Sequence, residues 1–198
     1  MKHIEGKIAG AIIFVGAVQF VLCLIIAEAL YPAYSISENY ISDLGVGVSA
    51  PIFNSSVFVL GLVAVVSASF MRSFVQDKIF IFFLALCGIG AMGVGIFPEN
   101  YGVIHTLVSL IAFLFGALSA IKSYKIQKPP SSYFAIVLGL ISLAALVLFA
   151  VSEVSDKLAI GHAAYFYLGL GKGGMERIIA YPIILWAIGL GGYLMGKS

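Results

Sequence analysis

The sequence predicts an all-α integral membrane protein, folded as a six-transmembrane-helix bundle in one domain over residues 1–198. Apolar residues make up 62% of the chain and charged residues only 10%, against about 45–50% and about 25% in soluble domains. The mean hydropathy is +1.11. The apolar residues also gather in runs of the roughly 20 residues that a helix needs to cross a hydrocarbon core. The runs are continuous and do not alternate, which argues against a barrel.

Six runs qualify as spans, at residues 8–27, 52–70, 79–97, 103–121, 134–151 and 178–195. No small-residue cleavage site follows the first run, so we expect it to remain in the protein as a helix. Gln19, in the middle of this run, is typical of a group that hydrogen-bonds between helices. The third run is rich in glycine and alanine, and such residues let helices approach closely. This pattern predicts a central place for the third helix.

The charged residues predict the orientation. Eight of the eleven Lys and Arg residues fall at the termini or in the second and fourth connections. Because basic residues collect on the cytoplasmic side, both termini are expected in the cytoplasm of a cell-membrane protein. Seven of the nine acidic residues fall on the outer side. The net charge of +2 is therefore the sum of a basic face and an acidic face, and it does not indicate a nucleic-acid partner.

The two longer outer connections contain local signals. Ser-Ile-Ser-Glu at residues 35–38 is a capping-box pattern and Gly45 is a plausible stop, which predicts a short helix over residues 36–44. Residues 163–170 are apolar and aromatic but too short to span, and they predict an interfacial helix. Glycines at 169–174 lack the phosphate-loop pattern. They form either a flexible turn or a set of amides open to an anion. Cys23 and Cys87 lie inside apolar runs and are expected to be buried free thiols.

Ionisable groups at the outer edge of the spans are the candidates for chemistry. Glu99 and His105 flank the start of the fourth run. Such groups are costly at that depth unless they have partners. If the protein is an enzyme, His105 would be a general base or metal ligand, Glu99 its partner, and Arg177 the anchor for a phosphate or carboxylate. Arg177 is also expected to pair with an outer carboxylate.

A divalent metal ion is a weaker hypothesis. His105, His162 and Glu99 are its candidate ligands, because imidazole and carboxylate groups bind such ions. No His-Glu-x-x-His pairing supports it. The alternative is a lid of salt bridges that closes the outer end of the bundle.

Several short motifs resemble a known family. They are Tyr-Ile-Ser-Asp-Leu-Gly at 40–45, Phe-Pro-Glu at 97–99 and Gly-x-Glu-Arg at 174–177, with Asn54, His105, Pro182 and Trp186 between or after them. Together they look like the DUF998 (domain of unknown function) family of small six-helix prokaryotic membrane proteins, over nearly the whole chain. The resemblance implies a six-helix fold and leaves the function open. It favours these polar residues as ligand-binding candidates: Ser42, Asp43, Asn54, Glu176 and Arg177.

The leading functional hypothesis is an outward-facing polar pocket that binds or hydrolyses a lipid headgroup or a small polar ligand, with membrane lipids as partners. A small-solute carrier is one alternative, but the middles of the spans are uncharged, which counts against ion coupling. A structural or accessory subunit is the other. Its glycine- and alanine-rich helix faces would contact a second copy or another membrane protein.

Overall fold

The computed structural model describes residues 2–158 and 167–196. Within these ranges the regular structure is helical, and six helices are long and apolar enough to cross a membrane, which confirms the prediction of an all-α fold with six such helices. They are α1 (Lys2–Leu30), α2 (Ala50–Met71), α3 (Lys78–Ile96), α4 (Val103–Lys122), α5 (Ser131–Lys157) and α7 (Gly171–Gly196). Four short 3₁₀ turns join them: η1 (Ser42–Gly45), η2 (Gly47–Ser49), η3 (Glu99–Tyr101) and η4 (Ser123–Lys125).

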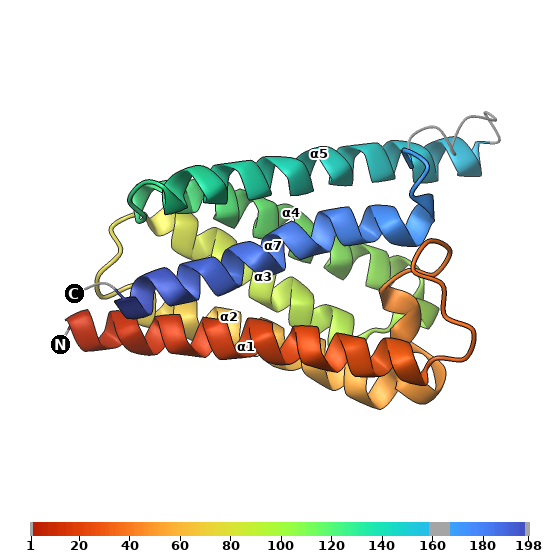
Figure 1. The fold of residues 1–198 in the computed structure, drawn as a ribbon, viewed down its shortest axis with the longest axis horizontal. Coiled ribbons are helices and arrows are strands. Elements are labelled where there is room, and N and C mark those ends of the chain that lie inside the picture. The colour runs from red at the N-terminus through yellow and green to blue at the C-terminus, as the bar shows by residue number, and fades with distance from the viewer. Residues whose placement is uncertain (1, 159–166, 197–198) are drawn as a thin grey trace.

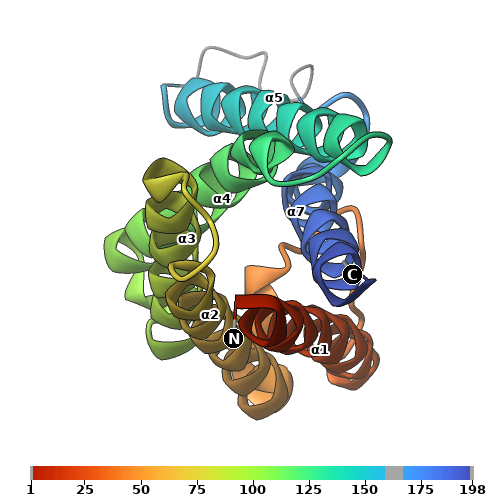
Figure 2. The ribbon, with the colours of Figure 1, turned by 90° about the vertical axis from the view of Figure 1, so that its left-hand side faces the viewer.

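The helices form a ring. Each helix from α1 to α5 packs against the next, and α7 lies between α5 and α1 and closes the ring (Figure 2). Both termini lie at one end, which we call the terminus end; it also carries the α2–α3 link and the α4–α5 link (Figure 1). The opposite end, the loop end, carries residues 31–49, η3 and the start of α7.

Close approach of backbones holds α2, α3 and α4 together. A Cβ on Gly61 would collide with the carbonyl oxygen of Gly88, and one on Gly90 would lie 2.5 Å from the amide nitrogen of Ala112. The glycine face of α3 is therefore used within the bundle. α3 is the second most buried of the six helices, with 44% of its apolar window buried against 50% for α7, but the helices form a ring and α3 is one member of it. The partner prediction for small-residue faces stays a prediction.

Two predicted boundaries are corrected by the structure. α7 begins at Gly171 and not at 178, so the glycines form its first turn. Residues 36–44 form turns and η1 in place of the predicted helix. The hydroxyl of Ser35 does accept from the amide of Glu38 (3.3 Å), but the amide of Ser35 donates to the side chain of Asn39 (3.0 Å) and not to Glu38. The capping box is thus half formed, and Asn39 diverts the chain into a turn.

Other local predictions are confirmed. The Gln19 side chain of α1 donates to the carbonyl oxygen of Ser56 in α2 at 2.9 Å. Cys23 and Cys87 are free thiols. Of the predicted interfacial helix, residues 163–166 lie outside the described residues, and a turn follows from 167.

Candidate binding site at the loop end

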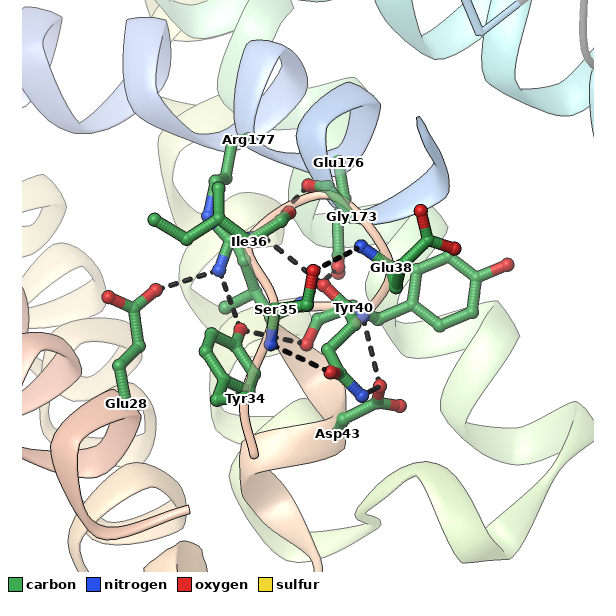
Figure 3. Close-up of polar contacts among 12 residues, drawn as sticks. Glu28, Tyr34, Ser35, Ile36, Glu38, Tyr40, Asp43, Gly173, Glu176 and Arg177 are labelled. Atoms are coloured by element: carbon green, nitrogen blue, oxygen red, sulfur yellow. Dashed lines mark hydrogen bonds and ion pairs between the residues drawn. The ribbon is translucent and has the colours of Figure 1, made fainter. Parts of the chain in front are cut away.

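The loop between α1 and α2 lies directly against the first turn of α7 (Figure 3). The amide of Gly173 donates to the carbonyl oxygen of Ser37 at 2.9 Å. A Cβ on Gly173 would collide with the carbonyl oxygen of Asn39. Glycine is required here because the loop backbone passes where any side chain would begin. The contact uses the Gly173 amide inside the protein, so this amide is not open to an anion.

Arg177 fixes the loop to two helices. It is 5% exposed. One terminal nitrogen donates to the Glu28 carboxylate of α1 (2.7 Å) and to the Tyr34 hydroxyl (2.6 Å). The other donates to the carbonyl oxygens of Ile36 (3.0 Å), Asn39 (3.3 Å) and Gly173 (2.9 Å). The expected pairing of Arg177 with a carboxylate is confirmed, and its partner is Glu28 of α1.

This network takes up the terminal N–H groups of Arg177, four in number in a guanidinium. Only its Nε lacks a hydrogen-bond partner, and that atom is buried. Burial, opposed by the hydrogen bond from Arg177, raises the pKa of Tyr34 to about 12. Tyr34 therefore stays neutral and donates to the carbonyl oxygen of Tyr40 (3.1 Å). Arg177 holds the lid of the bundle and keeps no terminal donor for a ligand.

Glu176 orders a different part of the loop. Its side chain is 7% exposed, and its carboxylate accepts from the backbone amides of Ile41 and Ser42 at the start of η1. Adjacent residues of α7 thus hold the loop at two places. In Figure 3, Glu176 and Arg177 reach the loop along separate paths from the same helix.

Asp43 and Glu99 form a carboxyl pair between η1 and η3. Asp43 accepts from the Asn39 side chain (2.9 Å) and from the amide of Tyr40 (3.0 Å). The Glu99 carboxyl is hydrogen-bonded to Asp43. Burial, then this hydrogen bond and the nearby Asp43 charge, raise the pKa of Glu99 to about 8. The Glu99 carboxyl is therefore largely protonated near neutral pH.

His105 lies apart from this pair. Its Nδ1 is 2.8 Å from the carbonyl oxygen of Phe97, and its Nε2 is 3.2 Å from the hydroxyl of Ser109. A carbonyl only accepts, so Nδ1 carries the hydrogen and Nε2 accepts from Ser109. The imidazole links the end of α3 to α4. Among the described residues no hydrogen bond or ion pair joins His105 to Glu99.

The structure does not support a metal site in residues 2–158 and 167–196, because no three His, Cys, Asp or Glu side chains come together there. His105 and Glu99 have the separate partners given above. The third candidate, His162, lies outside the described residues.

Asn54 holds η1 against α2. Its Nδ2 donates to the carbonyl oxygen of Gly45 at 3.0 Å, while its Oδ1 is buried without a partner. A Cβ on Gly45 would lie 2.8 Å from that oxygen. The role of Asn54 that the structure shows is to position η1.

A cavity of about 100 Å³ lies beneath η1, within the ring of helices. Its walls are apolar side chains of α1, α2, α3, α4 and α7, including Phe20, Phe53 and Ala91. The polar residues that line it are Ser42, Ser109 and Glu176. Ser42 and Glu176 were among the candidates named from the sequence, but the apolar residues of the walls were not. In the sequence, residues that line an apolar cavity cannot be told from residues that fill a core.

Comparison with known protein families gives a match. The model of a family described as "Protein of unknown function (DUF998)" matches residues 14–193. No curated protein matches the chain, and no solved structure matches it.

Proposed function

The chain therefore belongs to the DUF998 family, and we propose that it is a multi-pass cell-membrane protein that binds a small amphiphilic molecule at its loop end. The six apolar helices support insertion in a membrane. The excess of Lys and Arg at the terminus end supports cytoplasmic termini, which directs the loop end outward.

The observation that carries the proposal is the apolar cavity that ends at two polar side chains. The Ser42 hydroxyl makes no hydrogen bond to the described residues, although Ser42 is only 8% exposed and lines the cavity. Glu176 beside it is a buried acceptor. A hydroxyl group can donate one hydrogen bond and accept others, so the Ser42 hydroxyl is free to bond to a ligand in the cavity. A ligand hydroxyl or amine would supply the missing partner, with its apolar part between the helices.

The volume limits the size of that apolar part. A water molecule occupies about 30 Å³ in the liquid, and a dry cavity of about 150 Å³ accepts benzene. A cavity of about 100 Å³ therefore accepts a few carbon atoms. The ligand is a small amphiphile, or a larger lipid that inserts only a short segment.

The geometry favours binding over hydrolysis. Glu99 is bonded to Asp43, and His105 to Phe97 and Ser109, so no carboxylate orients the imidazole. A positioned base with an orienting partner is the usual arrangement for activating water. Arg177 does not face a ligand, which removes the proposed anchor for a phosphate.

A structural or accessory role is the second candidate, and the Arg177 network favours it. Three carbonyl oxygens, a hydroxyl and a carboxylate surround one guanidinium. A lid held in this way closes the bundle whether or not a ligand is present. The two candidates differ in whether the cavity beneath the lid takes a ligand.

Butylamine tests the binding proposal, because its apolar chain has only four carbon atoms and its amine is a donor that matches Glu176. We expect it to raise the midpoint of thermal unfolding of the purified protein in micelles. Ala91→Leu fills the cavity and Glu176→Gln removes the charge, and both are expected to abolish the rise. Ala144→Leu is the matched control, because Ala144 is exposed on α5.

Two results would contradict binding in the cavity. One is an equal response of the parent and all three variants, which would show partition of butylamine into the micelle. The other is a parent that does not respond. Ser42→Ala removes the hydroxyl and leaves the size of the cavity nearly unchanged. This variant is expected to show a smaller rise in the unfolding midpoint without being less stable than the parent when no ligand is present.

A further inference from the structure

A second hollow, of about 680 Å³, lies at the terminus end. It is bounded by the α2–α3 link, the end of α4 with η4, and the end of α7. Val75, Ile126 and Leu194 contribute apolar walls. Lys78, Lys122 and Lys125 contribute ammonium groups. The hollow is thus apolar in part and basic in part, and it lies where the helices end.

One carboxylate, that of Asp77, lies near two of these lysines. Oδ1 of Asp77 accepts from the amides of Ile79 (3.1 Å) and Phe80 (3.2 Å) and caps α3. Its Oδ2 lies 3.6 Å from Nζ of Lys122 and 3.8 Å from Nζ of Lys125. Both distances exceed the roughly 2.7–3.2 Å of a hydrogen bond. Each ammonium group therefore keeps its N–H donors for another acceptor.

Positive charge is in excess in this hollow. Lys122 and Lys125 share the single charge of Asp77, and Lys78 has no ion-pair partner among the described residues. Burial alone would raise the pKa of Asp77, but amide hydrogen bonds and the two lysines outweigh it and lower the pKa. Asp77 is therefore fully ionised at neutral pH, and a net charge of +2 remains.

We propose that this hollow binds a phosphate group, either in the headgroup of an anionic lipid or as free phosphate. Lys78 begins α3 and Lys122 ends α4, so both stand at the depth where a span meets the headgroups. Basic pockets between helices on the cytoplasmic side attract anionic headgroups. The apolar walls beside the lysines fit the glycerol and first carbons of a lipid. The site is separate from the loop-end cavity and does not depend on it.

The test is retention of lipid by the full chain, purified in micelles that contain phosphatidylglycerol or phosphatidylcholine. Native mass spectrometry measures the bound fraction. We expect the parent to retain phosphatidylglycerol selectively. The double variant Lys122→Gln, Lys125→Gln is expected to bind it roughly 25-fold more weakly, at roughly fivefold for each lysine. Lys7→Gln is the matched control, because Lys7 is an exposed lysine near the same end that does not line the hollow.

Asp77→Asn separates binding from a purely structural role of the lysines. Asparagine caps a helix about as well as aspartate, so α3 keeps its cap while the competing charge is removed. We expect this variant to bind the anionic lipid more tightly than the parent. If the lysines served only to pair with Asp77, the variant would gain nothing.

Inorganic phosphate at constant ionic strength distinguishes the two sources of the group. Binding of phosphatidylglycerol that phosphate does not displace supports a lipid headgroup, and displacement at equal concentrations supports free phosphate. Equal retention of the two lipids by the parent together with no binding of phosphate would overturn the proposal. So would a double variant that binds like Lys7→Gln.

Discussion

The two ends of the bundle use charge in opposite ways. At the loop end, Arg177 is 5% exposed and its terminal N–H groups are taken up by Glu28, Tyr34 and backbone carbonyls. At the terminus end, the Lys125 side chain is 48% exposed and shares one carboxylate with Lys122. Charge at the loop end holds the chain together, whereas charge at the terminus end remains available. The number of partners that each charged group has in the structure distinguishes these two roles. The position of the group in the sequence does not distinguish them.

The largest effect is expected from Arg177→Met. Removing one partner of a buried ion pair costs about 3–5 kcal/mol, and this pair is largely buried, with side-chain exposures of 6% for Arg177 and 20% for Glu28. Here Glu28 and three carbonyl oxygens would lose their donor. Denaturant titration in micelles would measure the free energy of unfolding. Lys125→Met, at the other end, is the comparison and is expected to change it by less than about 1 kcal/mol. Similar losses in the two variants would break the comparison between the ends.

Gly173→Ala is expected to destabilise the protein by about 2–3 kcal/mol, since the added methyl group overlaps the carbonyl oxygen of Asn39 and the loop must move. Gly192→Ala is the control on the same helix, where nothing lies within 4 Å of the new Cβ. The control is expected to be neutral or slightly stabilising, because alanine favours a helix over glycine. Thermal unfolding of both variants measures the difference, and equal midpoints would show that the loop is not packed against α7.

Ser123→Ala tests the packed layer beneath the exposed lysines. The fully buried Ser123 hydroxyl accepts from the side chains of Trp186 (2.9 Å) and Gln127 (2.8 Å). Its loss leaves two buried donors without a partner, which costs about 1–3 kcal/mol. Fluorescence of Trp186, the only tryptophan, would report both the changed environment and the unfolding transition. Ser69→Ala is the control, because Ser69 is exposed on α2. An equal effect of both would show that this layer is not rigid.

The spans could be predicted from the sequence because a long apolar run has one inexpensive arrangement in a membrane. Partners could not. Arg177 pairs with Glu28 across 149 positions, and several outer carboxylates were equally suitable by charge. Glu99 and His105 are close in sequence, yet the turn directs one to Asp43 and the other to Phe97.

The cavity and the loop were also beyond sequence reasoning, for different reasons. The walls of the cavity, such as Phe53 and Ala91, have the composition of any apolar core. Only the packing of five helices around one space leaves it unfilled. In the loop, the amide of Ser35 had two suitable partners, Asn39 and Glu38, and the local pattern could not tell which of them it bonds.

The carboxyl pair at the loop end gives stability a pH dependence. The pKa of Glu99 is about 8 in the folded protein, against an ordinary value of 4.5. Between these values the folded state keeps a proton that the unfolded state has released. Stability from this group is therefore fully present below pH 4.5 and is lost as pH rises toward 8. Unfolding midpoints measured across this range are expected to fall with rising pH, and Glu99→Gln is expected to flatten that part of the profile. An unchanged slope in the variant would assign the dependence to another group.

The smallest effect is expected at the terminus end in lipid-free micelles. Lys122→Gln with Lys125→Gln removes two ion pairs that lie at 3.6 and 3.8 Å and are partly exposed. Such pairs contribute about 0–1 kcal/mol and are screened by salt. We expect the unfolding midpoint of the double variant to match that of the parent in high salt, and to differ little in low salt. A loss above about 2 kcal/mol would place these lysines with Arg177 as parts of the framework. A loss confined to anionic lipid would instead mean that the same side chains bind a ligand, because only the bound state would then depend on them.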